Sequence, residues 1–420
     1  MQNKIKLFIY TIIGVSLPFL IRTTLFEYTI RNTNSPYTTI YLHSLDLILA
    51  LICVSLFWKT KRFPLSGSKI VDKLWITLFF WTFLQLLWVQ HPLITWFWGL
   101  RFYLGISLIW YIRELGSFKQ EISYIVKGFI IGMLGQALIV IMQVWFQRNI
   151  GLPVVIEPAL SPEISGIAKV SILDNVIIRG YGTFPHPNIL AFAGILALLL
   201  LYAKMFKKKL SIGIYVIALI LAGAVDHYIL TSIQVIVISV FTGLQLIYGK
   251  AVKFSPSFNV ISILALHILI ILSFSKLAFI LLLSLDFIWL TLLIRKSLFH
   301  VEQFQSRLKS LSRLVFDISM VAGVIILWAF PYSQLIDTVI KRLIYMQDAF
   351  AMVQSNLWIG VGLGQYVSNL PDNREFWQYE PVHNVPLLLF AEIGAIGMLS
   401  LLLIIAVEWY TLQYGYKKQR

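Results

Sequence analysis

A histidine stands where a polar stretch meets an apolar one near the C-terminal end of the chain. Tyr379-Glu380-Pro381-Val382-His383-Asn384 runs directly into an apolar segment that contains Glu392. An imidazole titrates near neutrality and can take a proton from a hydroxyl group, so His383 is a candidate general base. It could equally cap the helix that follows, together with Asn384. Glu392 would lie on the opposite side of a helix that begins at His383, so a direct pair of these two residues is not expected.

Three basic residues near the ends of apolar segments could hold an anionic group. Arg179 precedes a Gly- and Pro-rich turn, Lys276 follows Ser273-Phe274-Ser275, and Arg101 lies among aromatic residues. A guanidinium offers a planar, permanent charge suited to phosphate, and an ammonium offers a point charge. Each also has a structural explanation. Arg179 and Lys276 could extend to a membrane surface, whereas Arg101 either fits an aromatic interfacial belt or needs a partner.

The composition predicts an integral membrane protein. Apolar residues make up 59% of the 420 residues and charged residues 13%, with a mean hydropathy of +0.82. Apolar runs long enough to cross a bilayer recur along the chain. The net charge of +15 is explained by basic cytoplasmic loops, so nucleic acid is not expected as a partner. The single Cys53 excludes a disulfide framework and a cysteine metal site.

About twelve membrane-spanning helices are expected from the length that a bilayer requires. The fold class is therefore an all-α integral membrane protein, and the chain is interpreted as one membrane domain over residues 1–420. The apolar segment 259–294 is divided at Ser273–Lys276, because a lysine in mid-bilayer is costly. The expected spans are 6–21, 41–58, 74–90, 94–112, 122–146, 188–205, 210–225, 229–248, 259–274, 277–294, 314–330 and 386–409.

The distribution of lysine and arginine predicts that both chain ends face the cytoplasm. Two long loops, about 147–187 and 331–385, then lie on the outer side, where long loops often serve a function. The second contains apolar stretches at 335–346 and 350–359, which predict one or two amphipathic helices at the surface. Gly360-Val361-Gly362-Leu363-Gly364 lacks the preceding strand and the following lysine of a phosphate loop, so a flexible turn is expected there.

This topology places Arg179, Lys276, Arg101 and His383 on the outer side of the membrane, at helix mouths. Together they could surround an anionic lipid headgroup with a base nearby. No carboxylate cluster accompanies them in the sequence, so metal-dependent catalysis is not expected.

Three segments resemble the O-antigen ligase and O-antigen polymerase superfamily, and the similarity extends from about residue 95 to the C-terminal end. The first is Gly182-Thr183-Phe184-Pro185-His186-Pro187-Asn188-Ile189-Leu190-Ala191, with Arg179 ahead of it. The second runs from Arg342 to Gly364. The third is Pro381-Val382-His383-Asn384 through Glu392-Ile393-Gly394 and Gly397.

The resemblance implies a GT-C-type glycosyltransferase that uses a polyprenyl-diphosphate-linked glycan as donor. The reaction would take place at the outer face of the bacterial cytoplasmic membrane, with a glycan, lipid or protein hydroxyl group as acceptor and without metal, nucleotide or other cofactor. His383 would activate the acceptor. Arg179 and Lys276, with Arg101 as a further candidate, would hold the diphosphate. Supporting roles would belong to Asn188, His186, Asn384, Glu392 and Arg342.

Two alternatives remain open within this interpretation. The family commonly has a Ser-Arg pair where this chain has Ser275-Lys276, and a rival alignment uses Thr231-Ser232-Ile233-Gln234. From another functional class, a transporter or flippase of lipid-linked oligosaccharides is the alternative. That class typically has polar residues near the bilayer midplane and broken helices in paired halves, neither of which the sequence indicates. Ligase, polymerase and protein O-glycosyltransferase are not distinguished.

Overall fold

The computed structural model shows a predominantly helical chain that folds as two compact units. Unit 1 comprises Met1–Ile21 and Ser117–Asp337, and unit 2 comprises Arg22–Gly116 and Thr338–Arg420. The structure describes residues 2–19, 22–30, 33–34, 38–43, 46–47, 49–50, 54, 57, 69–114, 118–152, 159–164, 167–172, 175–203, 208–225, 238–239, 242–243, 245–246, 254–297, 317, 320, 332–371 and 379–418.

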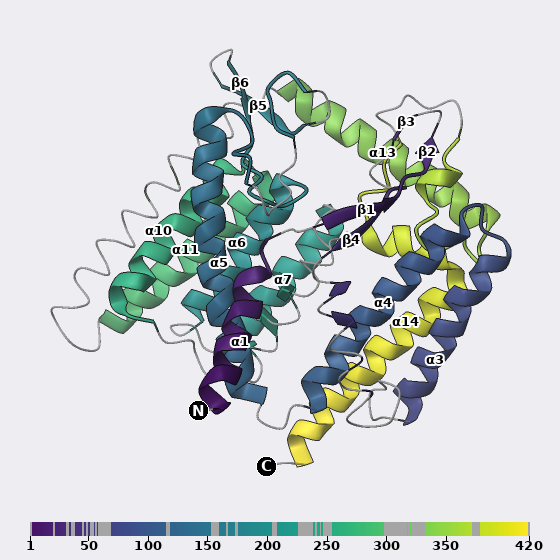
Figure 1. The fold of residues 1–420 in the computed structure, drawn as a ribbon, viewed down its shortest axis with the longest axis horizontal. Coiled ribbons are helices and arrows are strands. Elements are labelled where there is room, and N and C mark those ends of the chain that lie inside the picture. Colours follow the sequence, from purple (N-terminus) through teal and green to yellow (C-terminus); the bar gives the residue numbers. More distant parts are fainter. Residues whose placement is uncertain are drawn as a thin grey trace. The chain divides into compact units, whose positions relative to one another are not determined.

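Unit 1 is built around the buried helix α6 (Pro187–Tyr202), which packs against α10 (Pro256–Leu272) and α11 (Lys276–Ser297). Helix α5 (Phe118–Phe146) packs against α10 on one side and α1 (Gln2–Ser16) on the other, and α7 (Lys208–Val225) contacts α6 and α11 (Figure 1). Glycines allow the close approach of α1 and α5. A Cβ atom on Gly14 would lie 2.0 Å from the Ile125 carbonyl oxygen.

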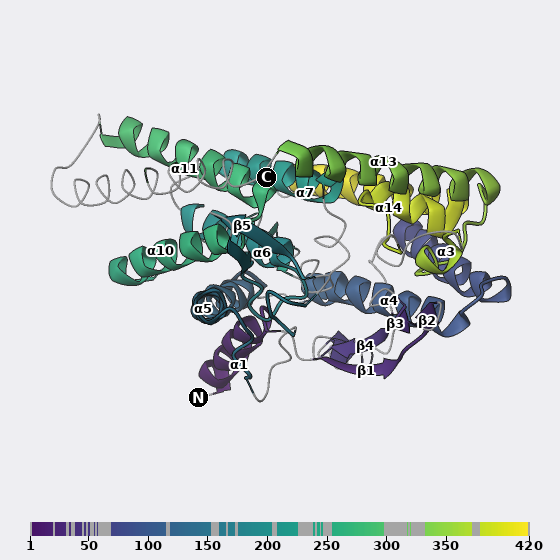
Figure 2. The ribbon, with the colours of Figure 1, turned by 90° about the horizontal axis from the view of Figure 1, so that it is seen from above.

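Unit 2 contains long helices and two small strand pairs. Helix α3 (Lys69–Leu84) packs against both α14 (Val385–Lys418) and α4 (Pro92–Glu114), as Figure 2 shows from above. The 3-10 turns η1 (Gln85–Leu87) and η2 (Val367–Asn369) lie in the connecting segments. Most of α13 (Tyr332–Ser355) also belongs to this unit, where Tyr345, Ala349 and Met352 pack in a core with the beginning of α14.

Several sequence predictions are confirmed by these elements. Helices α10 and α11 are separate and divide at the predicted turn, and a single helix, α13, covers most of the two apolar stretches predicted in the second long loop. Within the described part of the chain, two helices, Glu121–Phe146 and Val385–Val407, are long and apolar enough to cross a membrane. The number of twelve spans stays a prediction, since half of the span 41–58 and most of the spans 229–248 and 314–330 lie outside the described residues.

In addition to the helices, the described residues form three antiparallel two-stranded sheets, which the sequence interpretation did not predict. Strand β1 (Arg22–Phe26) pairs with β4 (Ile40–His43), β2 (Thr29–Ile30) with β3 (Thr33–Asn34), and β5 (Lys169–Ile172) with β6 (Asn175–Ile178). These segments are rich in β-branched residues, which favour extended backbone. The span predicted over 41–58 consequently begins inside a strand.

The last long helix, α14, is broken at Gly394, whose φ of 66° and ψ of −177° are not helical. The glycine turn Gly360–Gly364 pairs with the backbone at this break. The amide groups of Val361 and Gly362 donate to the carbonyl oxygens of Ala391 and Glu392, both at 2.9 Å, and Ala395 N donates to Leu357 O. The sequence interpretation gave 386–409 as one span and did not anticipate this break.

The glycine turn is a turn, as predicted, but it is buried and hydrogen-bonded, which is not expected of a flexible loop. Its glycines at 360, 362 and 364 have φ values of 68°, 108° and 76°, a region that L-residues with side chains rarely adopt. The side chain of Gln85 donates to the carbonyl oxygens of Ile359 and Glu392 and accepts a hydrogen bond from Leu363 N. One buried amide thus ties the turn to the broken helix.

Candidate functional site

In unit 1 the structure places Arg179 against the turn that precedes Lys276. The Arg179 Nε atom donates to the Ser273 carbonyl oxygen at 2.7 Å, and Nη2 donates to Asn188 Oδ1 at 2.6 Å. The backbone follows the same course, because Gly180 N donates to Leu272 O at 2.8 Å. Residues that are far apart in sequence therefore meet at one end of α6, α10 and α11. These two hydrogen bonds orient the guanidinium, and both acceptors are neutral oxygens.

The segment that carries Arg179 is held by two buried glutamines of α5. Gln143 Oε1 accepts hydrogen bonds from the amides of Tyr181 and Gly182, and Gln136 Oε1 accepts one from Thr183 N. Gly182 has a φ of 58°. The sequence interpretation missed both glutamines. Their spacing of seven residues places them on one face of an otherwise apolar helix, which is the signal that could have revealed them.

Helix α6 begins one residue before the predicted span 188–205, with Pro187 in its first turn. His186 is the residue before it and acts as the N-cap, since its Nδ1 atom accepts a hydrogen bond from Asn188 N at 3.2 Å. The Asn188 side chain is thereby placed beside Arg179. His186 and Asn188 both contribute to positioning, one through the helix end and the other through the guanidinium.

Lys276 is the first residue of α11 and is half-buried. Before it, Phe274 has a φ of 49°, and Ser275 Oγ accepts a hydrogen bond from Ala278 N at 3.5 Å. Ser273 Oγ donates to Ile270 O at 2.6 Å. The two serines therefore close α10 and open α11, and the resulting sharp turn sets the position of the lysine.

In unit 2 the structure assigns the helix cap to Asn384 and leaves the His383 ring beside an acidic and an aromatic residue. Asn384 Oδ1 accepts a hydrogen bond from Leu387 N at 3.1 Å at the beginning of α14. His383 Nε2 lies 3.8 Å from Glu380 Oε2, and the ring meets Tyr345 edge-to-face with a centroid distance of 5.6 Å. The alternative in which His383 shares the capping role is therefore not needed to explain this helix end.

Burial is the main cause that lowers the pKa of His383 to about 4, and the positive charge of Arg342 on α13 lowers it further. The Glu380 carboxylate acts in the opposite direction, but at 3.8 Å it does not form a hydrogen bond. The burial outweighs this attraction, since only 19% of the His383 side-chain surface is exposed. At neutral pH the imidazole is uncharged and can accept a proton.

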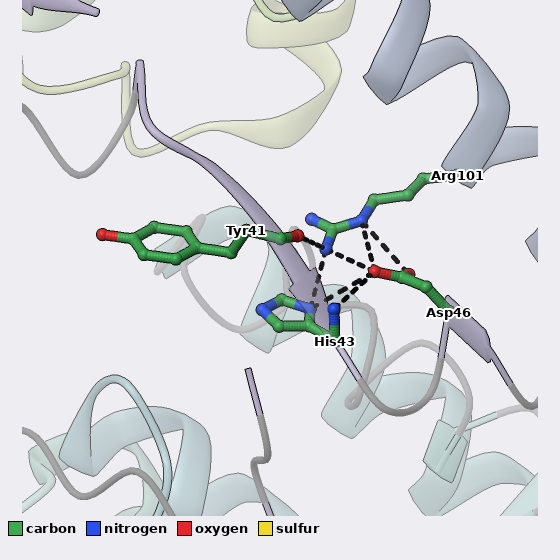
Figure 3. A network of polar contacts seen from close by, with 4 residues as sticks. All are labelled: Tyr41, His43, Asp46 and Arg101. Carbon is green, nitrogen blue, oxygen red and sulfur yellow. Dashed lines mark hydrogen bonds and ion pairs between the residues drawn. The ribbon is translucent and has the colours of Figure 1, made fainter. Parts of the chain in front are cut away.

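Arg101 has a carboxylate partner, as its position in a predicted span required. Figure 3 shows its guanidinium reaching from α4 to Asp46, with Nη2 at 2.6 Å from Asp46 Oδ2, next to the ring of His43 at 2.9 Å and the carbonyl of Tyr41. Arg101 is 8% exposed. This ion pair joins α4 to the end of strand β4. Because Asp46 already balances its charge, the geometry argues against the predicted role of Arg101 in binding a diphosphate.

Glu392 faces the glycine turn. Its Oε1 atom accepts a hydrogen bond from Tyr366 N at 3.3 Å, and the amide of Gly364 is a second backbone donor to the carboxylate. The residue is 7% exposed. Its side chain and its carbonyl oxygen thus both hold the turn at the break in α14.

Comparison of the chain with known proteins found no similar protein. No family model matches the chain, and no match was found among curated proteins or solved structures. The resemblance to the O-antigen ligase and polymerase superfamily therefore stays a prediction that rests on the residues quoted above.

Proposed function

We propose that the protein is a membrane glycosyltransferase. It moves a glycan from a polyprenyl diphosphate to an acceptor hydroxyl group at the outer face of the bacterial cytoplasmic membrane, with both chain ends in the cytoplasm. The observation that carries the proposal is His383, an uncharged imidazole beside Glu380 at the beginning of α14. It occupies the position at which the sequence resembles the superfamily most specifically.

The proposed reaction begins with the acceptor hydroxyl. Its oxygen attacks the anomeric carbon while His383 takes the proton, and the bond between that carbon and the diphosphate oxygen breaks with inversion. As the imidazole gains a positive charge, the Glu380 carboxylate at 3.8 Å offsets it. The departing polyprenyl diphosphate carries the electron pair of the broken bond.

Arg179 and Lys276 stabilise the charge that develops on the diphosphate. Cations that are oriented before the reaction stabilise a leaving group most effectively, because no reorganisation is needed as charge builds up. The hydrogen bonds of Arg179 to Ser273 and Asn188 supply that orientation. Lys276 contributes a point charge from the next helix.

A transporter or flippase of lipid-linked oligosaccharides is a second candidate, favoured by two features that the sequence interpretation did not anticipate. One is the break in α14 at Gly394. The other is a buried pair of ionisable residues, His267 and Asp286, within the helices of unit 1. Broken helices and buried ionisable groups are typical of transport pathways.

Purified protein in liposomes that contain the lipid-linked donor distinguishes the two candidates. The transferase proposal predicts release of polyprenyl diphosphate only when an acceptor is added. A flippase instead moves intact donor to the opposite leaflet without consuming it, and that result would contradict the proposal.

The acceptor class is tested by the glycans of a deletion strain. Loss of chain length alone indicates a polymerase. Accumulation of full-length polymer on its lipid carrier indicates a ligase, and loss of glycan from protein alone indicates a protein O-glycosyltransferase.

A further inference from the structure

Helix α14 changes character at its break. Over residues 387–393, before the break, every apolar side chain is buried or half-buried, and Leu388 and Ala391 belong to a core with α13. After Gly394 the helix exposes large apolar side chains, with exposed fractions between 38% and 57%, at Ile396, Leu399, Leu402, Leu403 and Ile405. The first segment is covered by protein, as in water, whereas the second has the apolar surface of a helix that faces lipid.

The break lies beside the end of the hairpin that α3 and α4 form. The indole group of Trp81 donates to the Ile393 carbonyl oxygen at 2.8 Å. The indole group of Trp88 donates to Gly360 O in the glycine turn at 3.3 Å. Between these two tryptophans, the Gln85 side chain holds the glycine turn and the broken helix together. The hairpin tip (residues 88–91), the glycine turn and the break therefore occupy one level of unit 2.

The hairpin has the length that a bilayer crossing requires. At about 1.5 Å per residue, the path from Lys69 at the beginning of α3 to Leu87 measures about 27 Å. The path from Pro92 to Arg113 near the end of α4 measures about 32 Å. The hydrocarbon core of a bilayer is about 30 Å thick. With the basic residues at one boundary of this core, the hairpin tip reaches the opposite boundary.

A placement based on α14 alone would be different. The segment Val385–Val407 is apolar and long enough to cross a membrane, and with Val385 at the boundary the break would lie about 14 Å inside the hydrocarbon. The hairpin tip, where Gln90 is exposed, would then also face lipid, in which an amide group finds no hydrogen-bonding partner. With the boundary at the break, Gln90 meets water. The path from Gly394 to Lys417, about 35 Å, still crosses the hydrocarbon.

Four apolar side chains at this level form what we call the boundary patch. Their exposed fractions are 81% for Leu87, 37% for Trp88, 42% for Leu357 and 63% for Trp358. The Leu357 carbonyl oxygen accepts a hydrogen bond from Ala395 N at 2.8 Å, which fixes this end of the patch to α14 just beyond the break. Tryptophan is enriched where a membrane meets water, because its ring is apolar and its N–H group is polar. The patch thus has the composition of a membrane–water interface.

Helix α13 extends the boundary patch. Its exposed Ile340, Leu343 and Phe350 lie within an arc of about 80° around the helix axis. The opposite side of the helix carries Tyr345, which is buried in the core with the beginning of α14. One side of α13 therefore packs on the protein, and the other offers an apolar strip that leads to Trp358.

We propose that the boundary patch rests on the outer leaflet of a lipid bilayer, with the membrane surface at the level of the hairpin tip and the break in α14. Lipid then covers the exposed sides of α3 and of α14 beyond Gly394. Residues 385–393, His383 and the glycine turn stand on the water side. The occupant is phospholipid rather than a second copy of the chain, because the exposed apolar surface continues from the patch along both helices. The proposal requires a bilayer but not the glycosyl transfer proposed above.

The direct test measures the depth of nitroxide spin labels on the full chain in phospholipid vesicles. Cys53→Ser removes the single cysteine of the sequence, and Leu87→Cys and Trp358→Cys carry labels in the boundary patch. Phe80→Cys and Leu402→Cys are matched controls, since both positions are exposed and apolar but lie farther along α3 and α14. The two controls should be about 10 Å deeper than the patch, with a higher ratio of accessibility to oxygen over a water-soluble nickel chelate.

Labels on the other side of the patch complete this test. Gln90→Cys and Pro386→Cys, at two exposed positions, should be accessible to the nickel chelate and not embedded in lipid. A label at Trp358→Cys that is as deep as the one at Phe80→Cys would overturn the proposal, because the break would then lie inside the hydrocarbon. Patch labels that neither reagent reaches would also overturn it, since protein rather than lipid would cover the patch.

A second measurement needs no label. Trp358→Phe keeps an apolar ring, so the fluorescence that this variant loses relative to the wild-type chain belongs to Trp358. Phospholipids brominated close to the headgroup should quench this part of the emission more strongly than phospholipids brominated near the end of the acyl chain. Stronger quenching by the deeper bromine atoms would place Trp358 near the bilayer centre and contradict the proposal.

Discussion

The two units use the same pair of residue types at a helix start, with the roles exchanged. At the beginning of α6, the ring of His186 caps the helix, and the amide of Asn188 orients Arg179. At the beginning of α14, the amide of Asn384 caps the helix, and the ring of His383 lies beside Glu380. Each unit therefore has one residue for the helix end and one directed to a charged group.

The difference follows from chain order rather than residue type. His186 directly precedes the first helical residue, Pro187, and so occupies the N-cap position. In α14 the N-cap position belongs to Asn384, and His383 lies one residue outside the helix. The capping role of His186 occupies its Nδ1 atom with the amide of Asn188, whereas His383 places Nε2 at 3.8 Å from Glu380 Oε2. His383 is therefore the histidine that we propose as the base.

Among substitutions that leave the proposed base in place, the largest expected effect comes from Arg179 in unit 1. Arg179→Ala should reduce the transfer rate about 100-fold, the size typical for removal of one oriented group that stabilises developing charge. Arg179→Lys should recover only part of it, because an ammonium cannot reproduce both hydrogen bonds to Ser273 and Asn188. The rate of polyprenyl diphosphate release measures both. Wild-type rates in Arg179→Ala would remove this residue from the proposed site.

The break in α14 predicts that alanine substitution of Gly394 changes the stability of the protein more than alanine substitution of Gly213. A Cβ atom on Gly394 would lie 2.5 Å from the Trp358 carbonyl oxygen, and the residue has a φ of 66°. Gly394→Ala should therefore destabilise the protein by at least about 2 kcal/mol. Gly213 in α7 has open space around it, so Gly213→Ala should be neutral or stabilising by up to about 1 kcal/mol. Thermal unfolding measures the stability of both variants. An equal loss of stability in the two would contradict the close packing at the break.

The positive charge of Arg342 near His383 should influence how the transfer rate depends on pH. The rate of transfer, measured as kcat/KM, should fall on acidification with a midpoint near the His383 pKa of about 4, because only the uncharged imidazole accepts a proton. Arg342→Gln should move this midpoint upward, since the guanidinium disfavours a charged imidazole. Lys341→Gln removes the same charge from the exposed neighbouring position and should leave the midpoint in place. Equal shifts in both variants would show that the effect is not local.

The low pKa of His383 in the folded chain should also make the stability of the protein depend on pH. The unfolded chain protonates His383 near pH 6.5, whereas the folded chain does so only near pH 4. Stability should therefore fall as pH decreases through this window, and His383→Gln should remove that part of the fall. Thermal unfolding between these pH values measures it. An unchanged pH dependence in the variant would mean that His383 titrates alike in both states.

The smallest expected effect is on stability and comes from Asn384, the N-cap of α14. Asn384→Ala should lower the stability by about 1 kcal/mol, as loss of an N-cap usually does. Asn384→Asp should retain it, because a carboxylate also accepts the hydrogen bond from Leu387 N. A full loss in Asn384→Asp would show that the side chain has a role other than capping.

Features set by local sequence were predictable, whereas those that depend on distant partners were not. Pro187 marks the first turn of α6, because proline restricts its own backbone, and Ser273–Lys276 separates α10 from α11, because a lysine in mid-bilayer is costly. The hydrogen bonds from Gln85 to Glu392 O and from Arg101 to Asp46 join segments that no periodicity connects. The break at Gly394 depends on the glycine turn more than thirty residues earlier.

The buried pair in unit 1 could have been predicted in part from the sequence. His267 and Asp286 each stand alone in an apolar run, which is visible in the sequence. Together with the turn between the two helices, that isolation could have predicted that they pair, since an ionisable residue in an apolar helix needs a partner. Tyr202 could not have been added, because only the packing of α6 brings its hydroxyl to Asp286.

The most direct test of the proposed function compares the two histidines in the same transfer assay. His383→Gln should abolish acceptor-dependent release of polyprenyl diphosphate, because glutamine cannot take the hydroxyl proton. His186→Gln should retain most of the release, since His186 caps a helix and does not act on the acceptor. Transfer at the wild-type rate by His383→Gln, or equal losses in both variants, would contradict the assignment of His383 as the base.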